Sequence, residues 1–202
     1  MTLVMAFIGA TGAAMAGDQR EITTFGDPEA TAALERELFS GFIRTDEALF
    51  GRAHDLGVRL SVRDDKVKVS RRDGVLVGEV TAFEGGILMR RRLYVSAGAY
   101  AIVDTGEGAP VPRGAGGAAN FVVLGNELTK AVANTIIGEG WRNGSLEDAI
   151  GTITRAMIRA AGETPSVSRQ FILLQTRTRG DIAGVMEEDG MAGGSGSKGS
   201  GR

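Results

Sequence analysis

The N-terminal segment 2–8 is typical of a β-strand, and both of its alternating faces are apolar. Successive strand residues point to opposite sides of a sheet, so one face carries Leu3, Met5 and Phe7 and the other carries Val4, Ala6 and Ile8. A strand that is apolar on both faces has to be covered on both sides. We therefore expect an α+β fold in which this sheet lies between another sheet and helices.

A second strand is expected at residues 12–20, after a glycine-containing turn, and it would return antiparallel to the first. This pairing carries the carboxylate of Asp18 back toward Thr2. A Met that precedes a residue as small as Thr is normally removed, which would leave Thr2 with a hydroxyl nucleophile and a free α-amine as its base. An α-amine titrates near about 7.7 to 8.0, so a useful fraction is neutral at cellular pH.

A secretory signal peptide is the alternative for this N-terminal stretch. Residues 3–16 are largely apolar, and Ala14-Met15-Ala16 is similar to a cleavage site whose use would remove Thr2. However, no Lys or Arg precedes Arg20, and glycines interrupt the apolar stretch. We therefore favour the strand.

Helix caps and hydrophobic spacing predict two pairs of helices. Asp27-Pro28 and Thr45 mark the starts of the first pair, and Ser145 marks the start of the last helix. The remaining expected elements are a helix at 127–139, strands at 59–63, 66–69, 75–83, 91–96, 100–104 and 170–176, and a mobile Gly- and Pro-rich loop at 106–117. The order is two strands, inserted helices, strands, two helices and a strand.

The length and composition of the chain limit the number of domains and the kinds of site that it can form. Its 202 residues, 43% of them hydrophobic, suffice for one domain. We expect that domain at 2–178, with a helical insertion at about 28–57 and a flexible Gly/Ser-rich tail at 179–202. With no cysteine and one histidine, neither a transition-metal site nor a cofactor is expected. A net charge of −2 and the lack of a long apolar run predict a cytoplasmic protein without nucleic-acid or membrane partners.

Two known families resemble this pattern. The strand, tight turn and second strand ending Ala-Gly-Asp-x-Arg resemble the start of catalytic proteasome β subunits, which are N-terminal-nucleophile hydrolases, and residues 121–127 continue the likeness ahead of the last helices and strand. Segments 40–47, 78–80 and 97–104 resemble connectases, the proteasome-related protein ligases of methanogenic archaea. The order and spacing of these motifs across 2–178 carry the resemblance. It implies a four-layer αββα sandwich.

The resemblance also implies a set of catalytic residues. Thr2 would be the nucleophile, Asp18 the acidic partner, and a lysine the neighbouring cation. If residues 28–60 contain the insertion, Lys66 at the start of a hairpin strand takes the place of that lysine, and Lys68 on the same strand face is the alternative. Asn126 stands where proteasome subunits have a serine, and Ser168 matches a serine before the last strand, without the aspartate that accompanies it in the family.

The implied activity is transpeptidation by a monomer. A connectase-like enzyme would form an acyl-enzyme on Thr2 with a Lys-Asp-Pro-Gly-Ala-type sequence, such as that of the methyltransferase A subunit of methanogens, and transfer it to an incoming amine. Ligation requires that water be excluded while the amine is held in place. A proteasome-like threonine peptidase and a non-catalytic scaffold of proteasome fold stay open as alternatives.

Overall fold

A computed structural model describes residues 3–84, 87–106, 108–118 and 120–191. Its first sheet has the strand order β10-β1-β2-β11, and all neighbouring strands are antiparallel. The strands are β1 (Val4–Ile8), β2 (Ala13–Asp18), β10 (Asn120–Leu124) and β11 (Phe171–Thr176). The stretch that resembles a signal cleavage site is therefore the buried middle of β2. Because β1 is the central partner of β2 and β10, its N-terminal end lies between the ends of both.

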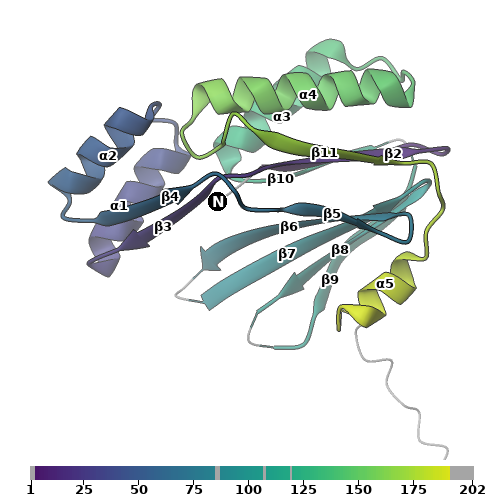
Figure 1. The fold of residues 1–202 in the computed structure, drawn as a ribbon, viewed down its shortest axis with the longest axis horizontal. Coiled ribbons are helices and arrows are strands. Elements are labelled where there is room, and N and C mark those ends of the chain that lie inside the picture. Colours follow the sequence, from purple (N-terminus) through teal and green to yellow (C-terminus); the bar gives the residue numbers. More distant parts are fainter. Residues whose placement is uncertain (1–2, 85–86, 107, 119, 192–202) are drawn as a thin grey trace, which may run out of the picture.

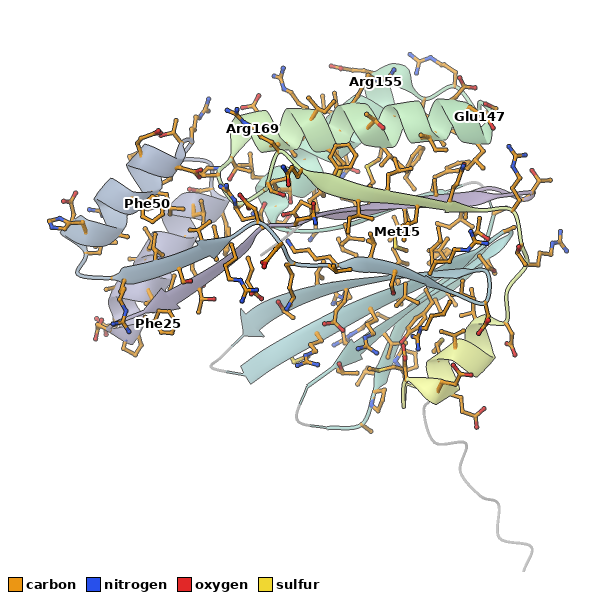
Figure 2. The ribbon with its side chains drawn as sticks, in the orientation of Figure 1. Met15, Phe25, Phe50, Glu147, Arg155 and Arg169 are labelled. Atoms are coloured by element: carbon orange, nitrogen blue, oxygen red, sulfur yellow. The ribbon has the colours of Figure 1, made fainter. Side chains whose placement is uncertain are left out.

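A second sheet packs against the first and has the order β5-β6-β7-β8-β9. Its strands are β5 (Val69–Arg72), β6 (Val75–Glu84), β7 (Ile87–Ser96), β8 (Ala99–Thr105) and β9 (Val111–Gly117). Met15 points from the first sheet toward the second (Figure 2) and belongs to the core between them, together with Val4, Leu76 and Leu93.

Both faces of β1 are covered, as its sequence predicts. Leu3, Met5 and Phe7 pack against α3 (Glu127–Gly140) and α4 (Leu146–Glu163), whereas the opposite face contacts the second sheet. The two helices lie on the outer side of the first sheet (Figure 1). The cap predicted at Ser145 is present as a complete capping box with Asp148, and Asn126, which was predicted as a site residue, caps α3. The α+β class is confirmed.

Residues 21–63 form an extension at one end of the molecule (Figure 1). It consists of the antiparallel ribbon β3 (Glu21–Phe25) and β4 (Arg59–Arg63), covered by α1 (Pro28–Phe39) and α2 (Asp46–Asp55). Asp27 and Thr45 cap these helices as predicted. The segment β3 was not predicted, because its alternation of polar and apolar residues is short and its partner β4 is distant in sequence.

Two sequence expectations for the second sheet are wrong. The expected mobile loop at 106–117 contains β9, which forms from main-chain pairing with β8 although its residues are exposed and mostly small. The first hairpin strand begins at Val69 rather than at residue 66. Residues 66–68 therefore precede the strand, and strand alternation does not fix the direction of their side chains.

The packed part of the chain also extends into the stretch expected to be a tail. Helix α5 (Ile182–Glu188) covers the outer face of the second sheet, where Val185 is buried against Val75 and Tyr94. Asp189 anchors this helix by accepting hydrogen bonds from Tyr94 Oη and from the Arg72 guanidinium. Residues 192–202 lie outside the described part of the chain. None of the described helices is long and apolar enough to cross a membrane.

Candidate active site

A buried ion pair lies beyond the N-terminal end of β1. Asp18, the last residue of β2, has no exposed surface, and the Lys68 side chain is 5% exposed. Lys68 Nζ donates to both carboxylate oxygens of Asp18, at 3.0 and 2.9 Å. Burying two charges is costly unless they are paired and hydrogen-bonded. A pair held in this way at the end of a sheet is a candidate for chemistry as well as for stability.

Main-chain groups fix the orientation of the Asp18 carboxylate. Oδ1 accepts from the N–H of Leu3 at 2.8 Å, and Oδ2 accepts from the N–H groups of Arg20 at 2.9 Å and Ser168 at 3.4 Å. The bond from Leu3 ties the ion pair to the chain immediately after Thr2. Thr2 itself, the predicted nucleophile, lies outside the described residues.

The structure brings Lys68, rather than Lys66, to Asp18. Lys66 has a half-exposed side chain, and its Nζ pairs with Glu21 at 3.1 Å. The Lys68 ammonium donates in addition to the main-chain oxygen of Arg20. Lys66 was preferred at the sequence level because it stands at the predicted start of the strand. Since the strand begins only at Val69, the chain at 66–68 is free to turn Lys68 inward.

Burial and charge act on Lys68 in opposite directions. Desolvation is the largest influence, and it lowers the pKa of Lys68 below the ordinary value of 10.5, although the negative charge of Asp18 raises it. Removing the ammonium from water therefore makes it a stronger acid than an exposed lysine. Such a cation can stabilise a nearby developing oxyanion.

Polar side chains that were predicted from sequence lie around the same end of the sheet. Ser168 Oγ accepts from the N–H of Gln19 at 2.8 Å and donates to the carbonyl of Gln170 at 2.5 Å. Asn126 Oδ1 accepts from the N–H of Thr129 as the cap of α3, and its amide donates to Ser166 Oγ at 3.5 Å. Ser168 thus contacts Asp18 directly through its main chain, whereas Asn126 joins a separate buried group with Ser166.

Two polar residues of that group were missed by sequence reasoning. Thr164 and Ser166 are fully buried, and Thr164 Oγ1 donates to Ser166 Oγ at 3.0 Å. Both belong to the segment Thr-Pro-Ser-Val-Ser that supplied Ser168. Their only signal in the sequence was the density of hydroxyl residues in a loop between a helix and a strand.

Arg20 is the other residue whose contacts were missed. Its guanidinium bonds to the carboxylates of Asp46 and Asp64 and to the carbonyl of Pro165, and its side chain is 11% exposed. The motif Ala-Gly-Asp-x-Arg indicated that an arginine follows Asp18. It gave no indication of its partners, which lie up to 145 positions away in sequence.

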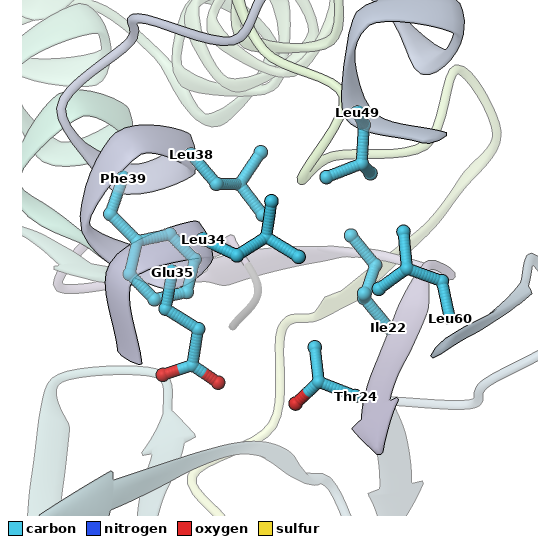
Figure 3. Close-up of a pocket in the computed structure, with 8 residues that line it drawn as sticks. All are labelled: Ile22, Thr24, Leu34, Glu35, Leu38, Phe39, Leu49 and Leu60. Carbon is cyan, nitrogen blue, oxygen red and sulfur yellow. The ribbon is translucent and has the colours of Figure 1, made fainter. Parts of the chain in front are cut away.

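Two hollows among the described residues lie away from this ion pair. A small pocket between the β3–β4 ribbon and the helices of the extension has a volume of only about 20 Å³, room for a single water. Figure 3 shows its lining, which consists of Ile22, Thr24, Leu34, Glu35, Leu38, Phe39, Leu49 and Leu60. A wider apolar hollow of about 440 Å³ lies beside α5 and is lined by residues of β8 and β9. Neither lining includes Asp18 or Lys68.

The described part of the chain contains no group of three or more His, Asp or Glu side chains suited to a metal ion. The acidic residues near the ion pair are already bonded to arginine or lysine.

Comparison with known proteins gives a family and a distant structural likeness. A family model described as the N-terminal domain of MJ0548-like connectases matches residues 1–189. Among solved structures, the chain is similar to the Anbu (Gly-1) mutant from Hyphomicrobium sp. strain MC1, with 12% sequence identity and a TM-score of 0.36 over 86% of this chain and 80% of that chain. A search of curated proteins finds no match.

Proposed function

The chain belongs to the connectase family through its N-terminal-domain match over residues 1–189, and from this premise we propose that it is a protein ligase that uses Thr2 as its nucleophile. The substrate would carry a Lys-Asp-Pro-Gly-Ala-type sequence. The αββα layering of N-terminal-nucleophile enzymes and a monomeric state belong to the same proposal.

The buried pair of Asp18 and Lys68 is the observation that carries the proposal. Asp18 accepts a hydrogen bond from the N–H of Leu3, the first described residue, and its carboxylate also binds the buried Lys68 ammonium. In the proposal, this carboxylate–ammonium pair serves the hydroxyl of Thr2. Its own α-amine, once Met1 is removed, is the nearest base.

In the proposed first step, Thr2 Oγ attacks a peptide carbonyl. The α-amine takes the hydroxyl proton, and the Lys68 ammonium, with its pKa lowered by burial, stabilises the negative charge that develops on Oγ. A main-chain N–H at the Gly125 turn donates to the oxyanion. When the C–N bond breaks, the α-amine returns its proton to the leaving amine, and an ester links the acyl group to Thr2.

In the second step, an incoming amine attacks the ester carbonyl. The amine gives a proton to the α-amine, the C–O bond breaks, and Thr2 Oγ regains its proton. Water would yield a free carboxylate by the same path, so ligation depends on holding the amine close and excluding water. The buried hydroxyl and amide groups of Asn126, Ser166 and Ser168 are the proposed neighbours of the α-amine.

Intact-mass measurement tests this function. Purified protein and its Thr2→Ala variant are incubated with a peptide that contains Lys-Asp-Pro-Gly-Ala, with and without a second peptide that supplies an amine. We expect loss of Met1, a Thr2-dependent adduct and exchange of peptide segments. Accumulation of free carboxylates would make the protein a peptidase, and an adduct-free protein with unchanged Met1 would refute catalysis by Thr2 on this substrate.

A further inference from the structure

Arg20 connects the helical extension to the buried ion pair. All five N–H groups of a guanidinium can donate, and Arg20 makes five side-chain hydrogen bonds: two to Asp64, two to Asp46 and one to the carbonyl of Pro165. The contact with Asp64 is bidentate, with Nε and Nη2 each 2.8 Å from a carboxylate oxygen. The side chain therefore has no donor left over and one geometry that satisfies all of its partners.

These partners come from three separate parts of the fold. Asp46 is the first residue of α2, Asp64 follows β4, and Pro165 lies in the loop after α4. That loop continues to Ser168, whose N–H also donates to Asp18. Arg20 thus joins the extension to the loop whose Ser168 binds Asp18.

The main chain of Arg20 contacts both members of the ion pair. Its N–H donates to Asp18 Oδ2 at 2.9 Å, and its carbonyl oxygen accepts from Lys68 Nζ. A side chain fixed at five points holds its own backbone in place. The position of the carbonyl that receives the Lys68 ammonium is therefore set by Asp46 of the extension, by Asp64 directly after it and by Pro165.

We propose that Arg20 is a positioning residue that couples the helical extension to the Lys68 ammonium, so that the two carboxylates that bind Arg20 help to position the catalytic groups. This inference rests on the proposed function for its catalytic consequence. The coupling of Arg20 to Lys68 can also be measured in an inactive variant, through the titration of Lys68.

The substitution Arg20→Lys keeps the positive charge but removes the planar, forked arrangement of the guanidinium donors. A lysine has three donors on a single nitrogen and cannot bridge two carboxylates and a carbonyl in the arginine geometry. Displacement of catalytic groups by about 1 Å costs on the order of 100-fold in rate. For Arg20→Lys we expect acyl-enzyme formation at saturating peptide to slow by about 10- to 100-fold. The peptide concentration for half-maximal rate should stay within about twofold, because no substrate contact is removed.

The titration of Lys68 in the Arg20→Lys variant distinguishes a positioning role of Arg20 from a role in stability alone. The carbonyl of Arg20 favours the charged form of Lys68, so moving it lowers the pKa of Lys68 further. We expect the basic limb of the pH–rate profile to move to lower pH in Arg20→Lys. The same shift should appear when the Lys68 side chain is titrated by NMR in the inactive Thr2→Ala background.

Three further variants test the coupling: Asp46→Asn, Asp64→Asn and Arg52→Lys. The first two weaken the partners of Arg20 one at a time, and both positions are about half exposed, so folding should persist. Arg52 is the matched control, because it forms a bidentate pair with Glu37 inside the same extension without contacting Asp18 or Lys68. We expect both Asn variants to show part of the Arg20→Lys effect and Arg52→Lys to show none.

The experiments distinguish failure of the proposed function from failure of the proposed coupling between Arg20 and Lys68. If the wild-type protein forms no Thr2-dependent adduct, the proposed function is refuted, and the NMR titration still decides whether Arg20 acts on Lys68. If the adduct forms but Arg20→Lys leaves the rate and the Lys68 titration unchanged, or if Arg52→Lys has the same effect, the coupling is refuted.

Discussion

Replacing Lys68 by Met tests whether the buried pair is the centre of this site. The substitution leaves the fully buried carboxylate of Asp18 without its cation. Removing one member of a buried ion pair typically costs about 3 to 5 kcal/mol. Three main-chain N–H groups still donate to Asp18, so we expect the lower end, about 3 kcal/mol. For a protein of this size that corresponds to a fall in Tm of about 6 to 12 °C.

Lys66→Met is the matched control for this experiment. Lys66 and its partner Glu21 are both more than one-third exposed, so the change should alter stability by less than about 0.5 kcal/mol. The free energies of unfolding are measured by urea denaturation at pH 7, and Thr2-dependent adduct formation is measured by mass. Only the Lys68 variant should lose both stability and adduct.

A double-substitution cycle identifies the cause of the loss. If the cost arises from an uncompensated charge, adding Asp18→Asn to Lys68→Met should cost less than the sum of the two single changes, by about 1 to 3 kcal/mol. Additive effects of the two changes, or a Lys66→Met variant that is equally impaired, would refute the assignment of Lys68 as the site lysine.

Three further outcomes follow from the structure. The rate of acyl-enzyme formation should rise with pH as the α-amine loses its proton near about 7.7 to 8.0. At higher pH the rate should decline again, and the decline should begin before pH 10.5 because burial lowers the pKa of Lys68. A rate that stays constant from pH 7 to 10 would contradict this. Gly78→Ala should destabilise by about 1 to 3 kcal/mol, since the new Cβ would lie 2.8 Å from Val4 Cγ1, whereas Gly51→Ala, with open space around it, should be neutral or stabilising in the same denaturation assay. Asp189→Asn should cost about 2 kcal/mol at pH 7, because it weakens hydrogen bonds to a charged group. Burial alone would raise the pKa of Asp189, but bonds from its arginine and tyrosine partners lower it. The stability that this carboxylate contributes is present above its unfolded pKa of about 3.9 and is lost as pH falls through the lower folded value, so the gap between variant and wild type should narrow in acid.

Local chemistry in the sequence was sufficient to predict most helices and the two-sided burial of β1. Side-chain caps such as those at Asp27, Thr45 and Ser145 act within three residues of the helix start, so no distant contact is needed to recognise them. The alternating apolar faces of β1 require cover on both sides regardless of which elements supply it.

Strand β9 and helix α5 were missed because distant pairing makes them. In β9 the hydrogen bonds come from the main chain of β8, and exposed small residues leave no hydrophobic pattern to recognise. In α5 a short segment is stabilised by the outer face of the second sheet and by the contacts of Asp189 with Arg72 and Tyr94.

In the candidate site, too, local contacts were predictable from the sequence and long-range contacts were not. The sequence is sufficient to predict that Asp18 returns beside the start of the apolar strand that follows Thr2, because a hairpin with a short turn fixes that register. The pairing of Asp18 with Lys68 rather than Lys66, and the bonds from Arg20 to Asp46 and Pro165, depend on the tertiary structure. Those contacts join residues 26 to 145 positions apart in sequence, and which of them form depends on how the two sheets and the extension pack, since a buried charge is stable only where packing provides its partner.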